Sequence, residues 1–208
     1  MSLQRLVLWR HGETGYNVAG RIQGHLDIEL TETGHRQARR AAPVVAGFEP
    51  DVVRSSDLRR AIATAAAFTE VSGIEVAVDK RLRETCLGQW QGLSGAEVEH
   101  GWPGAMVEWR SSATWAPPGG ESRVDVAARA LEVVEELDAA HDGTALLCAH
   151  GGLITGLTAK LLGWPLEQWP TLGGLGNCHW VVLVRRTQPR GWRLVTYNAG
   201  VPDDWSPL

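Results

Sequence analysis

Short apolar runs alternate with longer amphipathic stretches along this chain. The apolar runs are typical of buried strands, which we expect at residues 6–9, 51–55, 75–78, 144–149, 179–184 and 193–197. Helical spacing of apolar residues predicts helices between them, at 30–45, 58–69, 122–137 and 153–162. This alternation predicts an α/β fold, a three-layer α/β/α sandwich with a largely parallel central sheet.

Three of the predicted helices begin next to side chains that can cap them. Thr31 suits the first helix, Ser56 or Asp57 the second, and Ser122 with Asp125 resembles a capping box at the third. The apolar spacing also predicts which residues are buried. These are Leu58, Ile62, Ala65 and Phe68 in the second helix and Val124, Ala127, Leu131, Val134 and Leu137 in the third.

The stretch from about 85 to 121 differs from the rest. It is rich in Gly, Trp and Pro, and only residues 94–99 have a helical pattern. We expect an irregular excursion over the sheet edge within a single domain spanning residues 1–208. Its tryptophans argue against disorder, and several of the chain's 10 tryptophans are expected to wall a cleft.

Composition excludes several classes of function. The formal net charge of −4 gives no reason to expect nucleic-acid binding, and no apolar run could span a membrane. The first five residues do not resemble a signal peptide. Three widely spaced cysteines suggest neither a zinc site nor a disulfide framework, so we expect a cytoplasmic protein. Nothing in the composition excludes a homodimer.

Two of the apolar strands end in the same dipeptide. His11-Gly12 follows the first strand, with Arg10 before it, and His150-Gly151 follows the strand at 144–149. If the two strands are parallel neighbours, both histidines face one pocket at the carboxyl edge of the sheet. Gly12 is expected to let the backbone turn sharply there. The two histidines could instead be unrelated, hydrogen-bonded residues of the structure.

Paired arginines follow a third strand. Arg59 and Arg60 fall in the first turn of the helix at 58–69, and an arginine beside a helix N-terminus is a natural anion site. Spacing alone does not decide which of the two faces the pocket and which is solvated.

Four motifs together resemble the signature of the histidine phosphatase superfamily, which includes phosphoglycerate mutases and many phosphatases. They are Arg10-His11-Gly12-Glu13-Thr14 with Asn17, Ser56-Asp57-Leu58-x-Arg60-Ala61, Leu82-Arg83-Glu84 and His150-Gly151. The resemblance implies that His11 is the nucleophile and becomes phosphohistidine, and that Glu84 is the general acid. It also implies that Arg60, and not Arg59, is the arginine of the phosphate site. The substrate and phosphate site it implies comprises Arg10, His11, Asn17, Gln23, Gly24, Arg60, Glu84, His150 and Gly151.

These residue types suit phosphoryl transfer without a metal or another cofactor. Two arginines and a second histidine can balance the charge on the phosphoryl oxygens while His11 attacks phosphorus. A phosphoglycerate mutase is the main alternative, although we expect this short chain to lack the mutases' longer insertion and tail. A non-catalytic phospho-ligand binding module and a two-histidine metal site are weaker alternatives.

Further stretches resemble one group in this superfamily, the actinobacterial glucosyl-3-phosphoglycerate phosphatases. These stretches are Arg81 to Leu93, Ala113 to Arg129 and Trp169 to Asn177. The resemblance implies that a small phosphorylated sugar acid is the substrate. Glu13 departs from the group, which carries glutamine there, so a broad-specificity phosphatase stays open. We expect the loops between Glu84 and Ser122 and around 172–177 to set specificity.

Overall fold

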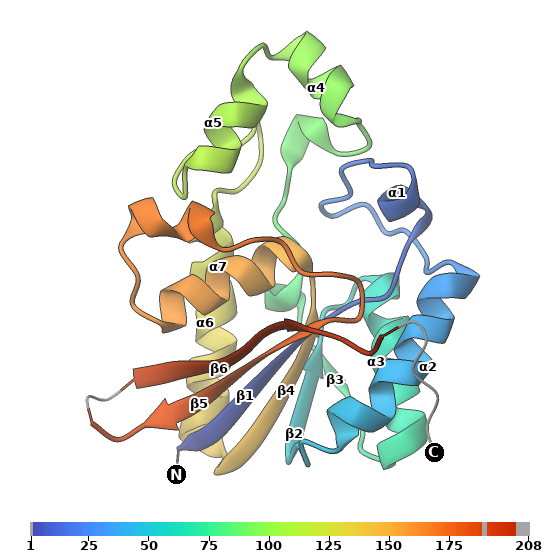
Figure 1. Cartoon of the computed structure of the whole chain (residues 1–208), viewed down its shortest axis with the longest axis vertical. Helices are drawn as coiled ribbons and strands as arrows, with labels where there is room; N and C mark the ends of the chain where they lie inside the picture. The colour runs from blue at the N-terminus through green and yellow to red at the C-terminus, as the bar shows by residue number, and fades with distance from the viewer. Residues whose placement is uncertain (1, 189–190, 203–208) are drawn as a thin grey trace.

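The computed structural model describes residues 2–188 and 191–202 and contains one six-stranded sheet (Figure 1). Its strand order is β3-β2-β4-β1-β5-β6. The strands are β1 (Leu3–Arg10), β2 (Val52–Ser55), β3 (Ala77–Val78), β4 (Gly143–Ala149), β5 (Trp180–Arg186) and β6 (Gly191–Ala199). β5 alone runs against its neighbours. The prediction of a largely parallel sheet is therefore confirmed.

Helices cover both faces of this sheet. The α-helices are α1 (Gly15–Val18), α2 (Glu32–Ala46), α3 (Arg59–Ser72), α4 (Gly95–Gly101), α5 (Ala105–Ser111), α6 (Arg123–Ala140) and α7 (Gly151–Leu161). Single 3-10 turns are η1 (Lys80–Leu82), η2 (Gly88–Trp90) and η3 (Leu166–Thr171). None of the helices in the described part of the chain is long and apolar enough to cross a bilayer.

Alternation along β1 divides the core in two. Leu6 and Leu8 pack with α6 and α7, whereas Val7 and Trp9 pack with α2 and α3. Successive side chains of a strand point to opposite faces, so one apolar run of β1 serves both layers. The predicted three-layer sandwich is confirmed (Figure 1).

Two of the three predicted helix caps are present. Thr31 accepts a hydrogen bond from the backbone of Gly34, and Ser122 forms a capping box with Asp125. The prediction of Ser56 or Asp57 as the cap of α3 is wrong, because Leu58 is the N-cap and makes no side-chain cap bond. The Ser56 hydroxyl lies 2.8 Å from a ring nitrogen of His150 and the Asp57 carboxylate pairs with Arg83.

The predicted buried faces are partly wrong. Ile62 is 43% exposed, since α3 turns a neighbouring face inward. The buried residues of α3 are Arg60, Ala61, Thr64, Ala65, Ala67 and Phe68. In α6, Val124 and Leu131 are only half-buried, and Val126, Ala130 and Val133 are buried instead. Because Arg60 and Thr64 are polar, the sequence pattern does not identify them as buried positions.

The excursion at 85–121 is more regular than predicted. It contains η2 and α4 and also α5, which the sequence analysis missed because no residue of α5 is buried and no apolar stripe marks it. Figure 1 shows α4 and α5 standing beyond the carboxyl edge of the sheet. Trp90 is fully buried there and contacts the rings of Trp102, Trp109 and Trp115.

The two ends of this excursion are fastened to each other. The backbone N–H of Glu121 donates to the carbonyl of Cys86 at 2.7 Å, and the Cys86 N–H donates to the Glu121 carboxylate at 2.8 Å. Gly88 also lies against the chain at Pro118, where a Cβ would come within 2.2 Å of a carbonyl. The segment therefore leaves and rejoins the sheet domain at one point.

Candidate active site

His11 and His150 lie at the ends of adjacent parallel strands. Arg10 of β1 is in register with Ala149 of β4, and the His11 N–H donates to the Ala149 carbonyl at 3.0 Å. The two imidazole centroids are 5.1 Å apart, with exposures of only 2% and 0%. The expectation that the two His-Gly strand ends lie side by side is thus confirmed.

One nitrogen of the His11 ring is bonded to the neighbouring backbone. Its Nδ1 lies 2.7 Å from the carbonyl of Gly12. Because a carbonyl can only accept, Nδ1 carries the ring proton and Nε2 keeps its lone pair. Burial, followed by the charges of Arg10 and Arg60, holds the pKa of His11 well below its usual value. The ring is therefore neutral at physiological pH.

Gly12 is required for a different reason than the one predicted. Its φ is not in the left-handed region, so no special turn conformation is needed. A Cβ at Gly12 would lie 2.5 Å from the carbonyl oxygen of Gly34, and a Cβ at Gly34 would lie 2.1 Å from that of Glu13. The two glycines let the start of α2 pack directly on the nucleophile loop. The Gly12 N–H donates to Thr64 of α3 at 3.0 Å.

Arg60 is fully buried under the two histidines. Its Nη1 donates to the Leu26 carbonyl at 2.7 Å and its Nη2 to the Gly24 carbonyl at 2.8 Å. Its Nε lies 3.2 Å from Nδ1 of His150. Burial lowers the pKa of Arg60 to about 10, so the guanidinium stays charged at neutral pH. One N–H on each terminal nitrogen remains for a ligand.

Both ring nitrogens of His150 have protein partners. Because the Arg60 guanidinium can only donate, Nδ1 of His150 is the acceptor and Nε2 carries the proton toward the Ser56 hydroxyl, 2.8 Å away. Burial and the charge of Arg60 hold the pKa of His150 well below its usual value. In this arrangement His150 is neutral and orients Arg60.

Arg10 keeps a donor unused. Its Nη1 donates to the Leu175 carbonyl, while its buried Nε has no hydrogen-bond partner among the described residues. A Cβ on Gly151 would come within 3.4 Å of this Nε, so the glycine keeps the space beside it open. Burial lowers the pKa of Arg10. A buried cation with a spare donor suits an anionic ligand.

Two amide side chains complete the predicted phosphate site. The Asn17 Oδ1 accepts from the backbone N–H of Thr14 and from Asn177 Nδ2, both at 3.1 Å. Gln23 Oε1 accepts from the Thr14 hydroxyl at 2.9 Å. With their oxygens held, both residues have their NH₂ groups left to donate. Gly24, predicted as a phosphate contact, contributes through its carbonyl by holding Arg60.

Glu84 lies at the N-terminus of α7. Its carboxylate accepts backbone N–H bonds from Thr85 and Leu153, both at 2.9 Å, and from Gly152 at 3.0 Å. The first N–H groups of a helix have no partner within the helix, and two of those of α7 donate to Glu84. Glu84, which is predicted to be the general acid, therefore lines the same cavity as Arg10 and Gly151.

Arg129 holds the backbone of the acid loop, a role that the sequence analysis missed. Its guanidinium donates to the carbonyls of Arg81, Arg83 and Glu84 at 2.7–2.8 Å. It also forms a two-point ion pair with Glu121. Arg129 lies in the middle of α6, where the sequence resembles any solvated helix face, so no local pattern marked it.

The cavity beside the acid has a volume of about 290 Å³. It extends from the site toward α5, the start of α6 and η3. Its lining residues are Arg10, Glu84, Thr85, Trp109, Arg123, Gly151, Gly152, Thr155, Trp169, Pro170, Leu172, Gly174 and Leu175. The expectation that tryptophans wall a cleft is met by Trp109 and Trp169. Among the described residues, no three His, Cys, Asp or Glu side chains are grouped so that they could hold a metal ion.

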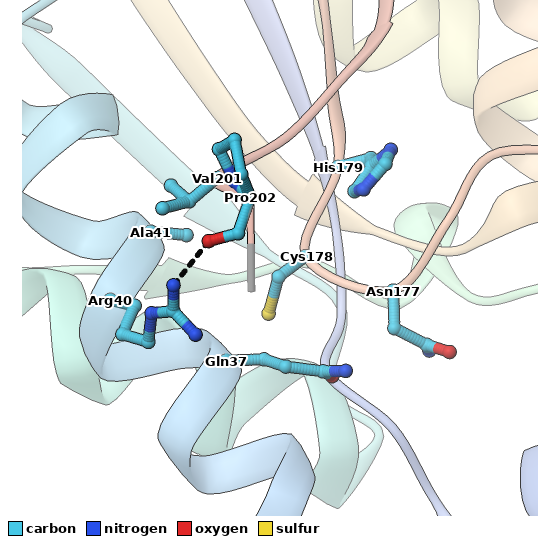
Figure 2. Close-up of a pocket in the computed structure, with 8 residues that line it drawn as sticks. All are labelled: Gln37, Arg40, Ala41, Asn177, Cys178, His179, Val201 and Pro202. Atoms are coloured by element: carbon cyan, nitrogen blue, oxygen red, sulfur yellow. Dashed lines mark hydrogen bonds between the residues drawn. The ribbon is translucent and has the colours of Figure 1, made fainter. Parts of the chain in front are cut away.

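A second cavity, of about 270 Å³, contains none of the predicted catalytic residues (Figure 2). In this view Arg40 reaches the Pro202 carbonyl, to which it donates a hydrogen bond. Gln37, which also lines the cavity, accepts a hydrogen bond from the Glu13 N–H at 2.9 Å. Asn177 borders this cavity and connects it to the nucleophile loop.

Comparison with known proteins agrees with this geometry. Residues 6–200 match the model of the histidine phosphatase superfamily, branch 1. The chain is 49% identical to the glucosyl-3-phosphoglycerate phosphatases of Mycolicibacterium vanbaalenii and Mycobacterium tuberculosis, covering 96% of both chains in each case. It is 35% identical to a 2,3-bisphosphoglycerate-dependent phosphoglycerate mutase of Gloeobacter violaceus, over 75% of this chain and 74% of the relative.

Solved structures agree as well. A mycobacterial glucosyl-3-phosphoglycerate phosphatase in complex with VO3 superposes with a TM-score of 0.91 at 51% identity, over 95% of this chain and all of the other. The same enzyme with inorganic phosphate gives a TM-score of 0.89 at 48% identity, over 95% and 98%. On this evidence of sequence, fold and site, the chain belongs to branch 1 of the histidine phosphatase superfamily.

Proposed function

We propose that this protein is a phosphatase that hydrolyses glucosyl-3-phosphoglycerate to glucosylglycerate and phosphate through a phosphohistidine on His11. The observation that carries the chemistry is the neutral His11 ring, with its Nε2 lone pair, buried beside the guanidinium groups of Arg10 and Arg60. The identity of 49% over nearly the whole length of the mycobacterial phosphatases supports this substrate.

In the first step, Nε2 of His11 attacks phosphorus and the P–O ester bond breaks. Arg10 and Arg60 balance the charge that spreads over the phosphoryl oxygens, with the amides of Asn17 and Gln23 donating further hydrogen bonds. The leaving alkoxide takes a proton from Glu84. Three backbone N–H bonds hold the Glu84 carboxyl group in position for this step.

In the second step, water attacks the phosphohistidine. Glu84, now a carboxylate, removes one proton from this water as the new O–P bond forms and the N–P bond breaks. His11 regains its lone pair and inorganic phosphate leaves. His150 stays neutral and keeps Arg60 in place. All steps use groups of this chain, so we expect no dependence on a metal ion, and a chelator should leave the rate unchanged.

The test combines turnover with trapping of the intermediate. Phosphate release is measured for glucosyl-3-phosphoglycerate, 3-phosphoglycerate, sugar phosphates and p-nitrophenyl phosphate. We expect the largest kcat/KM for glucosyl-3-phosphoglycerate, and an acid-labile phosphoenzyme that the His11→Ala variant does not form. His100→Ala, which changes an exposed histidine of α4, is the matched control.

Three results would contradict the proposal. Equal kcat/KM for every phosphomonoester would indicate a broad-specificity phosphatase. Interconversion of 2- and 3-phosphoglycerate, stimulated by 2,3-bisphosphoglycerate and with little phosphate release, would indicate a mutase. Phosphate binding without any release would indicate a binding module.

We also propose a cytoplasmic location. Cys86, Cys148 and Cys178 are all free thiols in the structure, which fits a reducing compartment. Cell fractionation with antibody detection tests the location. Light scattering of the purified protein determines whether it forms the homodimer that composition leaves open.

A further inference from the structure

Arg123 differs from the other arginines around the acid loop because no carboxylate balances it. Arg81, Arg83 and Arg129 each pair with an acidic side chain within 2.8 Å. Arg123, the first residue of α6, has no ion pair within the described residues and is half-buried. An unbalanced cation in a partly desolvated place calls for an anion that the chain itself does not supply.

The hydrogen bonds of Arg123 leave one edge of its guanidinium unused. Nη1 donates to the carbonyls of Trp109, Arg110 and Ser112, at 2.8, 3.3 and 2.6 Å. These carbonyls end α5, so Nη1 fixes the side chain in place. Nε and Nη2 make no hydrogen bond to any described residue. These two donors form the edge that binds a carboxylate with two parallel hydrogen bonds.

The Arg123 guanidinium lies against an aromatic ring. It stacks over the ring of Trp109 at 5.1 Å from the centroid, and Trp109 and Trp169 line the same cavity. The Trp109 Nε1 is buried without an acceptor in the described structure. Rigid aromatic walls are suited to the apolar face of a sugar ring.

The cavity joins this edge to the reacting centre. Arg123 lines it together with Arg10 and Glu84, so one ligand in this cavity can contact Arg10, Glu84 and Arg123. A glycerate ester of phosphate carries two anionic groups on one short carbon chain. Arg10 and Arg60 are placed to receive the phosphate, and Arg123 is the next cation along the cavity.

We propose that Arg123 binds the carboxylate of the substrate and that Trp109 and Trp169 flank its sugar, which makes Arg123 a specificity-determining residue. This inference rests on the proposed phosphatase function and adds the substrate class that the cavity selects: phosphomonoesters with a carboxylate near the ester oxygen. Phosphomonoesters without that carboxylate gain nothing from Arg123.

The experiment compares two substrates that differ in the carboxylate alone. The kcat/KM for phosphate release is measured with 3-phosphoglycerate and with glycerol 3-phosphate, for the wild type, Arg123→Gln and Arg123→Lys. We expect Arg123→Gln to lower the ratio of the two specificity constants about 30-fold, mainly through the KM for 3-phosphoglycerate. Arg123→Lys keeps the charge but loses the fork, and we expect an intermediate ratio. Arg110→Gln, an exposed neighbour, is the control.

An unchanged ratio in Arg123→Gln would overturn the inference, as would an equal fall for both substrates, which would indicate a purely structural role at the end of α5. A binding measurement separates this from failure of the proposed function. Calorimetry in a His11→Ala background, which needs no turnover, should show weaker binding of 3-phosphoglycerate but not of glycerol 3-phosphate when Arg123→Gln is added. Equal affinities of 3-phosphoglycerate with and without that change would overturn the inference even in an inactive protein.

Discussion

Asn177 Nδ2 lies 3.1 Å from Oδ1 of Asn17 and 3.2 Å from the carbonyl of His11. The two N–H groups of Asn177 thus connect the loop before β5 to His11 and to Asn17, a predicted phosphate contact. Together with the Thr14 N–H, the bond from Asn177 holds the oxygen of the Asn17 amide and leaves its NH₂ group for a ligand. Asn177 is therefore a positioning residue.

A double-mutant cycle tests this role. Asn177→Leu, which keeps a similar volume but removes both donors, should lower kcat/KM about 10-fold. If Asn177 acts through Asn17, the double variant with Asn17→Leu should be little worse than Asn17→Leu alone. Gln168→Leu, an exposed change in η3, is the control. Additive effects of the two changes would refute the coupling.

The sequence predicted which strand ends meet at this site better than it predicted the contacts that support them. His11, Arg10 and His150 follow apolar strands, and parallel pairing then brings the strand ends together, so their meeting could be inferred from a local pattern. Asn177 and Arg129 act through hydrogen bonds to backbone carbonyls across long separations in sequence. A carbonyl has no sequence signature, so these contacts could not be predicted.

The same distinction explains the errors in the fold. Strand order and layers follow from hydrophobic runs, which burial enforces. The cap of α3 was mispredicted because Ser56 and Asp57 are used by His150 and Arg83, and α5 was missed because it buries no residue. Local propensity predicts helix caps poorly where the capping side chain is bonded to a site residue, and it predicts helices poorly where they lie outside the core.

Replacing Arg129 by lysine should lower both the stability and the activity of the protein, although the charge is kept. Lysine cannot reproduce the fork that reaches three carbonyls and Glu121, so Arg129→Lys should lower the free energy of unfolding by about 2–3 kcal/mol. We also expect kcat to fall about 10-fold, since Glu84 loses its backbone support. Urea unfolding and steady-state kinetics measure both effects.

Arg81→Lys provides the comparison for this change. Arg81 pairs with Asp79 and with the exposed Glu136, so the free energy of unfolding should change by about 1 kcal/mol or less. Equal effects of Arg81→Lys and Arg129→Lys would contradict the special role of Arg129.

The packing of α2 on the nucleophile loop predicts that Gly34 matters to catalysis. A methyl group there would lie 2.1 Å from the Glu13 carbonyl, so the loop must move. We expect Gly34→Ala to lower the free energy of unfolding by about 1–3 kcal/mol and to reduce kcat as well. Gly15→Ala, where a Cβ meets nothing within 4 Å, should change neither. Normal activity and stability in Gly34→Ala would exclude this contact.

The two buried histidines predict a loss of stability in mild acid. Both have pKa values lowered by burial, so below about pH 6.5 the unfolded chain binds protons there that the folded chain does not. The two neutral histidines contribute to the free energy of unfolding above pH 6.5. This contribution is lost as the pH falls toward their pKa values in the folded protein. The slope should approach about 1.4 kcal/mol per pH unit for each histidine.

Urea titrations between pH 7.5 and 5.5 measure this slope. The carboxylates whose pKa values are lowered, such as those of Asp57 and Asp79, titrate in the unfolded chain near pH 4 and contribute little in this range. His11→Asn should reduce the slope but leave the part that comes from His150 and from His25, whose pKa burial also lowers. A stability that is flat over this range would show that the histidines take up protons in the folded protein.

The hydrogen bonds between Cys86 and Glu121 have a consequence for how this enzyme family diversifies. They close the segment carrying α4, α5 and the tryptophan cluster at its base, so its two ends stay at fixed positions whatever lies between them. The nucleophile, its arginines and the acid all lie outside the closed segment. The segment can therefore vary in sequence between these two residues, while Arg123 and Trp169 on the far side of the cavity keep their places in the sheet domain.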